Sequence, residues 1–127
     1  NMIKKINLIT NSRIKNAKYL NGKLKSIKQI KIIKDPKKYK SVYHLYQFYC
    51  EKRDQLNIFL RSNKIDSKIH YPKPLHLHDA AKKFKYNKGQ FKNAEKLSKK
   101  VISIPVHEFV SKKQLDLIIN KIQKFYN

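Results

Sequence analysis

Residues 101–126 read VISIPVHEFVSKKQLDLIINKIQKFY and join a strand-type segment to an amphipathic helix. Val101–Ile104 favours a β-strand, and Pro105 closes it because proline cannot donate to a strand ladder. Ser111 and Gln114 have the spacing of a capping box. The apolar residues that follow fall on one helical face: Leu115, Ile118, Ile119, Ile122 and Phe125 or Tyr126. We therefore predict a C-terminal helix that packs on a sheet.

Three upstream segments have the composition of further strands. They are Ile30–Ile33, which leads into a turn at Asp35-Pro36, then Ser41–Cys50, and Ser67–Tyr71, which Pro72 and Pro74 stop. Together with Val101–Ile104 they predict a mainly antiparallel sheet.

Helical periodicity marks the segments between these strands. From Ile3 to Leu24 one face carries Ile3, Ile6, Thr10, Arg13, Ala17, Leu20 and Leu24, so we predict a long helix. A second helix is expected from Asp54 to Asn63, with Asp54 as its N-cap and Leu56, Phe59 and Leu60 inward. Residues 75–89 are expected to form a loop holding a short helix, before a helix over Ala94–Lys100. The predicted fold class is α/β (α+β), with the sheet covered mainly on one side by the first and last helices.

The chain is expected to be one domain, residues 1–127, and a fragment. Its length and its 40% hydrophobic residues suit a single folded core. The first helix begins almost at residue 1 with no capping residue before Ile3, as if cut from a longer chain. Met2 as a genuine start is the alternative.

The net charge of +23 makes nucleic acid the first partner class to consider. The excess is nearly all lysine, spread along the chain, with Arg13, Arg53 and Arg61 as the only arginines. Arginine is the residue favoured for bidentate recognition of phosphate and guanine, so this pattern disfavours a nucleic-acid partner. A lysine-rich solvated surface from an A/T-rich genome explains the charge.

Location and redox state follow from two features of the sequence. No apolar run is long enough to span a membrane, and the N-terminus lacks the core of a signal peptide, so we expect a cytoplasmic protein. Cys50 is the single cysteine, which excludes an intrachain disulfide, and we interpret it as a strand residue.

The densest group of polar and aromatic residues is His70-Tyr71-Pro72-Lys73-Pro74-Leu75-His76-Leu77-His78. It begins where a predicted strand ends, in a loop that two prolines stiffen, and such loops concentrate function. The histidines match no common zinc spacing, so no metal is predicted. They are candidates for acid–base work or phosphate contact. His44 within a strand and His107 after Pro105 favour structural roles, as does Arg13, whose stem would pack at the core edge.

Six strings in this order carry a resemblance to a known family: RIKNAKYL (13–20), SVYHLY (41–46), RDQL (53–56), IHYPKPLH (69–76), AEKL (94–97) and ISIP (102–105). Their order and spacing resemble the C-terminal domain of DegT/DnrJ/StrS sugar aminotransferases. The resemblance covers nearly the whole chain, and the His-Tyr-Pro-x-Pro-Leu-His run is its most specific part.

The resemblance implies the small domain of a fold-type-I aminotransferase, a homodimer that uses pyridoxal phosphate. The acceptor would be a nucleotide-linked keto sugar and the amino donor commonly glutamate. His70, Tyr71 and His76 match substrate-side residues, and Arg13 and His44 are candidates for active-site support. The lysine that holds the cofactor belongs to the large domain, so no catalytic residue and no cofactor are expected in this chain alone.

Two departures from the family stand out. Lys64 occupies a position where relatives often have glycine after a helix, and lysine disfavours the left-handed conformation of such a cap. His78 stands where relatives often have glutamine.

Two alternatives to an aminotransferase fragment remain. One is a free-standing basic module that binds nucleic acid or a sugar nucleotide. The other is a subunit that docks with a separately encoded large domain.

Overall fold

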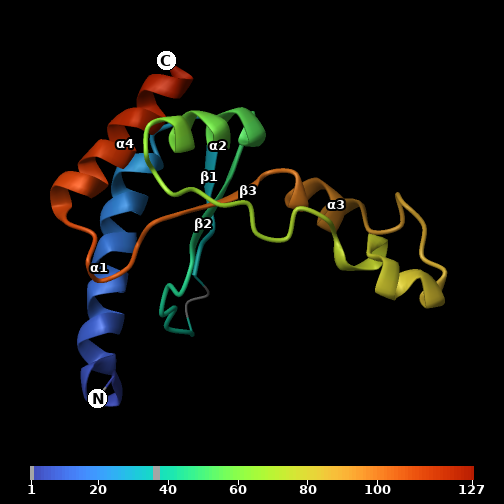
Figure 1. The fold of residues 1–127 in the computed structure, drawn as a ribbon, viewed down its shortest axis with the longest axis horizontal. Coiled ribbons are helices and arrows are strands. Elements are labelled where there is room, and N and C mark those ends of the chain that lie inside the picture. Colours follow the sequence, from blue (N-terminus) through green and yellow to red (C-terminus); the bar gives the residue numbers. More distant parts are fainter. Residues whose placement is uncertain (1, 36–37) are drawn as a thin grey trace.

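The computed structural model describes residues 2–35 and 38–127, and Figure 1 shows their arrangement. A short 3-10 turn, Met2–Lys5, leads into helix α1, Ile6–Leu24, and strands β1, Ile30–Ile32, and β2, Tyr46–Cys50, follow. Helix α2, Arg53–Ser62, precedes a long excursion, and the chain ends with β3, Val101–Ile104, and helix α4, Lys112–Tyr126. The excursion holds two 3-10 turns, Leu75–Leu77 and Asp79–Phe84, and helix α3, Lys92–Ser98. We call residues 72–100 the arm, because Figure 1 shows this part projecting from the rest.

The sheet is three-stranded and antiparallel in the order β1-β2-β3, as the fold prediction requires. Ile30 lies opposite Cys50, and Phe48 lies opposite both Ile32 and Ile102. Since side chains alternate along a strand, these residues share one face.

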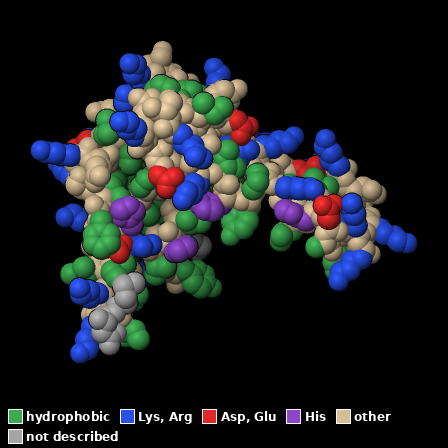
Figure 2. All heavy atoms as spheres, viewed as in Figure 1, with side chains coloured by type: hydrophobic (Ala, Val, Ile, Leu, Met, Phe, Trp, Pro, Cys, Tyr) green, Lys and Arg blue, Asp and Glu red, His purple; other side chains and the backbone are tan. Residues whose placement is uncertain are grey.

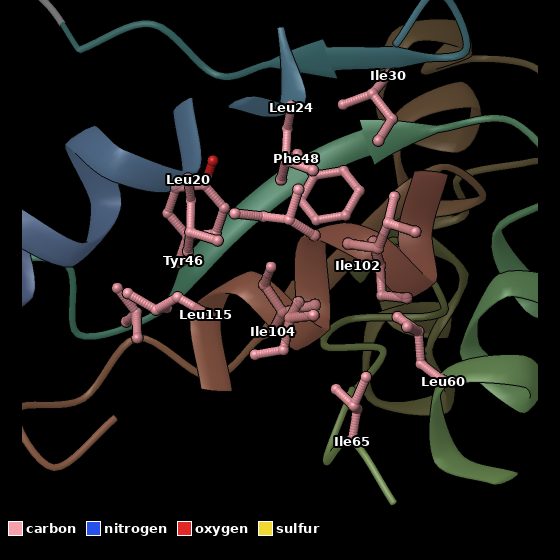
Figure 3. Packing of buried hydrophobic residues seen from close by; sticks show 14 of the residues in the cluster. Leu20, Leu24, Ile30, Tyr46, Phe48, Leu60, Ile65, Ile102, Ile104 and Leu115 are labelled. Carbon is pink, nitrogen blue, oxygen red and sulfur yellow. The ribbon is translucent and has the colours of Figure 1, made fainter. Parts of the chain in front are cut away.

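The core lies between that face and three helices. Leu20 and Leu24 of α1, Leu56 and Leu60 of α2 and four residues of α4 are buried with Tyr46, Phe48, Ile102 and Ile104 of the sheet. Figure 3 shows the side chains of Leu20, Leu60 and Leu115 gathered around these strand residues. Burial of each large apolar side chain contributes about 1.5–3 kcal/mol. The prediction of a sheet covered mainly on one side is confirmed.

Helix α4 follows its sequence pattern closely. The Ser111 hydroxyl accepts from the Gln114 N–H at 3.3 Å, and the Gln114 side chain accepts from the Ser111 N–H at 2.8 Å. The two bonds form the predicted capping box. Leu115, Ile118, Ile119 and Ile122 are all buried, as predicted.

Several predicted boundaries were wrong for physical reasons. Strand β2 begins at Tyr46 rather than Ser41, so His44 lies in a bend before the strand. Ser67–Tyr71 is not a strand: Lys68 alone makes an isolated antiparallel bridge with Ser103, because the chain turns away beyond it. The apolar stripe of α1 is buried only from Ala17 onward, while Ile3 and Ile6 are exposed. The turn expected at Asp35-Pro36 lies partly outside the described residues.

The start and end of α2 also differ from expectation. The N-cap is Lys52, in a left-handed conformation, and Asp54 lies in the first turn instead. At the other end Lys64 has φ +60°, the conformation that lysine was predicted to disfavour. The N–H groups of Lys64 and Ile65 donate to the carbonyls of Arg61 and Leu60, both at 3.0 Å, which is the bonding pattern of a Schellman cap. The cap forms despite the unsuited residue, because Ile65 and Leu60 are buried together.

Candidate functional site

The second face of the sheet, which we call the open face, carries the strand residues that point away from the core. It consists of Lys31, Gln47, Tyr49, Val101 and Ser103. The helices α1, α2 and α4 contribute to the core on the opposite face. The open face is therefore where the sheet can meet a ligand or another domain.

His70 reaches this face through the Lys68–Ser103 bridge. Backbone bonds of 3.0 and 2.8 Å join Lys68 and Ser103 in both directions and fix the segment beside β3. Two residues later the His70 Nδ1 lies 2.8 Å from the Ser103 hydroxyl oxygen. Gln47 donates to the same oxygen at 3.2 Å, which leaves the serine proton free to donate to His70. In that arrangement the Nε2 atom of the half-buried imidazole carries the ring proton and stays available to a ligand.

A hollow of about 290 Å³ opens beside His70. Arg13 and His44, the two residues predicted to support the site, line it together with His70 and His107. Figure 2 shows histidine side chains gathered between the N-terminal helix and the base of the arm. The structure thus brings three of the five sequence-predicted site residues to one place.

Arg13 is held in position rather than free. Its Nε donates to Glu108 at 3.1 Å, and a terminal nitrogen donates to the His44 carbonyl at 3.4 Å. The pKa of the Glu108 carboxyl is lowered first by a hydrogen bond from the backbone N–H of Glu108 itself, and then by the contact with Arg13. The ion pair fixes the guanidinium at the edge of the hollow, where its remaining N–H groups can meet an anion.

Tyr71 lies beside a different hollow, of about 420 Å³, that Tyr49, Leu75, Leu97 and Val101 also line. Tyr71 as a residue is 73% exposed, and its φ is +58°. A bulky residue rarely takes this conformation, and strained residues of this kind cluster at functional sites. His70 and Tyr71 are neighbours in the chain, but they line two different hollows.

His76 is placed within the arm instead. Its Nε2 lies 3.1 Å from Glu95, and only 8% of its side chain is exposed. The Glu95 carboxylate also accepts from the Gly89 N–H at 2.7 Å, and this bond, ahead of the His76 contact, lowers the pKa of Glu95. The His78 ring bonds to the Lys73 carbonyl at 3.0 Å. Both histidines therefore organise the arm.

Sequence reasoning missed three residues that orient the site: Ser103, Gln47 and Glu108. Ser103 is the polar position in Val-Ile-Ser-Ile, so strand alternation alone places it on the face away from the core. Nothing in the sequence pairs Glu108 with Arg13.

The described residues contain neither a metal site nor a lysine suited to hold pyridoxal phosphate. No group of three or more His, Cys, Asp or Glu side chains is arranged to hold a metal ion there. No lysine of residues 2–35 and 38–127 is buried, and Lys100 and Lys121 are the two that are half-buried. A lysine that binds pyridoxal phosphate covalently must be positioned and desolvated, so these residues do not fit that group. No helix in this part of the chain is long and apolar enough to cross a membrane.

Comparison with known proteins gives one consistent result. The sequence profile of the DegT/DnrJ/EryC1/StrS aminotransferase family matches residues 1–123. The chain is 35% identical over 85 residues to a "pleiotropic regulatory protein" of Geobacillus stearothermophilus, covering 67% of this chain and 23% of that protein. It is 30% identical over 84 residues to the dTDP-3-amino-3,4,6-trideoxy-α-D-glucose transaminase of Streptomyces venezuelae, covering 66% of this chain and 22% of the transaminase.

Solved structures agree. A DegT DnrJ EryC1 StrS aminotransferase from Brucella abortus superposes with a TM-score of 0.89 at 30% identity, covering 98% of this chain and 33% of that one. A protein of Streptococcus pneumoniae described as a "putative sugar aminotransferase", solved in its PMP form, superposes with a TM-score of 0.84 at 21% identity, covering 96% of this chain and 32% of that one. The chain thus spans about a quarter to a third of the length of these proteins.

Proposed function

Because this chain belongs to the DegT/DnrJ/EryC1/StrS aminotransferase family, we propose that it forms the C-terminal part of an enzyme that transfers an amino group to a nucleotide-linked keto sugar. The transaminase of Streptomyces venezuelae, whose name specifies a dTDP-linked amino sugar, supports this substrate class. The amino donor in the proposal is glutamate and the enzyme is a cytoplasmic homodimer.

The cofactor of the family is pyridoxal phosphate, which supplies the electron-withdrawing chemistry of amino transfer when bound. None of the described lysines is buried, and this supports the proposal that another region of the enzyme holds the cofactor. These 127 residues then contribute the substrate-facing wall.

One observation carries the site assignment: His70 is held on the open face by the Ser103 hydroxyl, which Gln47 orients in turn, beside the hollow that Arg13 lines. We propose that His70 contacts the keto sugar, that Arg13 and His44 support that contact, and that Tyr71 lies along the nucleotide sugar. His76 contributes to the site by holding the arm.

The test is His70→Ala in the full-length enzyme, assayed with a keto-sugar nucleotide and glutamate. Loss of one positioned contact worth about 1.4 kcal/mol lowers turnover by about tenfold. The free energy of unfolding should change little, because the half-buried histidine contributes little packing.

The matched control is Leu115→Ala on the core face of α4. Leu115 is 3% exposed, so its truncation should cost about 2–5 kcal/mol of stability while activity per folded molecule is kept. If His70→Ala unfolds the domain and leaves that specific activity unchanged, His70 is structural and the assignment fails.

A further inference from the structure

The arm stands apart from the core of this domain. It leaves after Tyr71 and returns at Val101, and none of residues 72–100 is buried as a whole residue, although the His76 side chain is only 8% exposed. Figure 1 shows α3 and the two 3-10 turns extending away from the sheet and its three helices. A segment with so little burial gains almost nothing from the hydrophobic effect within its own domain.

A polar clamp nevertheless gives the arm a defined shape. The Glu95 carboxylate binds the His76 ring on one side and the Gly89 N–H on the other. The His76 ring also packs on Phe91, with ring centroids 4.7 Å apart. The first 3-10 turn of the arm, the loop at Gly89 and α3 are thereby tied to one point.

The clamp presents three aromatic rings to solvent, which we call the aromatic cluster: Phe84, Tyr86 and Phe91. Phe84 and Tyr86 stack with centroids 6.1 Å apart, and Tyr86 meets Phe91 edge to face at 5.1 Å. The rings are 59%, 46% and 43% exposed. Contiguous exposed apolar residues on an ordered segment mark an interaction surface.

The rim of the cluster is basic. Lys82, Lys83, Lys85, Lys88 and Lys92 are near the three aromatic residues in sequence and are all exposed, and the Lys83 ammonium lies 5.2 Å from the centre of the Phe84 ring. The arm has two carboxylates: Asp79 pairs with Lys82 at 2.9 Å, and Glu95 is part of the clamp. An occupant must therefore combine an apolar centre with an acidic surround.

We propose that the aromatic cluster docks on an acidic, apolar patch of the cofactor-bearing domain of the same aminotransferase. A second copy of residues 1–127 fits poorly, because two chains of net charge +23 repel each other. The remainder of the enzyme is large enough to cover the arm, since this chain aligns with 33% of the Brucella abortus structure. This inference rests on the proposed function for the existence of that domain.

The experiment is zero-length carbodiimide cross-linking of the full-length enzyme, with mass-spectrometric mapping. This reagent joins a lysine to a carboxylate in direct contact. Lys83, Lys85 or Lys88 should couple to Asp or Glu residues of the cofactor-bearing domain, and 0.5 M salt should reduce the yield because it screens the charges. The double variant Phe84→Ser, Tyr86→Ser should lower the yield by about tenfold, the scale of losing central interface anchors.

The control variant is Ile58→Ser, which changes an apolar residue of α2 that is 68% exposed, and it should leave the cross-links unchanged. The double variant retains Phe91, so the clamp persists. Cross-links confined to residues 1–127, or a yield that the double variant does not lower, would overturn the proposal. If the cross-links form but the enzyme does not aminate keto-sugar nucleotides, the proposed function is refuted and the docking proposal is still supported.

Discussion

At the scale of single residues, the left-handed cap at Lys64 predicts a substitution that stabilises the domain. A Cβ atom at φ +60° costs about 1–2 kcal/mol, and glycine removes this strain at some cost in chain entropy. Lys64→Gly should therefore raise the free energy of unfolding by about 0.5–1 kcal/mol in denaturant titrations. The control is Lys113→Gly in α4. Because Lys113 has ordinary helical geometry, glycine there should lower the free energy of unfolding by about 1 kcal/mol. Equal effects of the two changes would show that the Lys64 cap is unstrained.

Cys50 predicts a dependence of stability on alkaline pH. Burial raises the pKa of its thiol to about 11, whereas an unfolded cysteine has a pKa of about 8.5. Above pH 8.5 the unfolded state releases this proton first, so stability present at neutral pH declines as the pH rises toward 11. Unfolding free energies of the wild type and Cys50→Ala should converge between pH 8 and 10.5. A constant difference would contradict the raised pKa.

At the scale of elements, Arg53 joins the base of the arm to α2. One terminal nitrogen donates to the carbonyls of Ser98 and Val101 at 3.0 and 3.1 Å. Its Nε lies 2.8 Å from Asp54, but the N–H does not point at the carboxylate, so this contact is an ion pair without a hydrogen bond. The side chain is 7% exposed. It fixes the angle at which the arm leaves the sheet.

Replacing Arg53 by Met should therefore loosen that junction. Two half-buried carbonyls lose a hydrogen-bond partner, which costs up to about 1–3 kcal/mol of stability, and amide exchange near Val101 should accelerate. Arg61→Met on the exposed side of the same helix should change stability by less than about 0.5 kcal/mol. Unchanged exchange near Val101 in Arg53→Met would show that other contacts hold the arm.

Local signals explain which elements the sequence predicts well. The capping box and apolar stripe of α4 lie within a few residues of each other, and the pattern of buried residues matches them. Ser67–Tyr71 has strand composition, but ladder formation needs a partner, and only Lys68 finds one. The Arg13–Glu108 pair joins residues 95 positions apart, so no local pattern could reveal it. In the candidate site, local patterns therefore indicated His70, His44, Arg13 and the outward position of Ser103, but not the Glu108 pairing that holds Arg13.

At the scale of the whole molecule, the charge predicts weak binding to polyanions. Lysines spread over the surface act by releasing counterions, without reading bases. Affinity for DNA or RNA should be indifferent to sequence and should fall by orders of magnitude between 50 and 200 mM salt, as measured by fluorescence anisotropy. Binding that survives physiological salt and discriminates between sequences would favour the basic-module alternative instead.

The Lys68–Ser103 bridge has a consequence for how such enzymes diversify. It joins the two ends of the excursion that contains the arm, so the sheet closes there whatever lies between. Each doubling of a loop's length costs only about 0.6 kcal/mol in closure entropy. Changes in the length of the arm should therefore cost little in loop-closure entropy, while they change the surface offered to a substrate and to a neighbouring domain. We therefore expect the arm to tolerate changes in its length and sequence without loss of the three-stranded sheet.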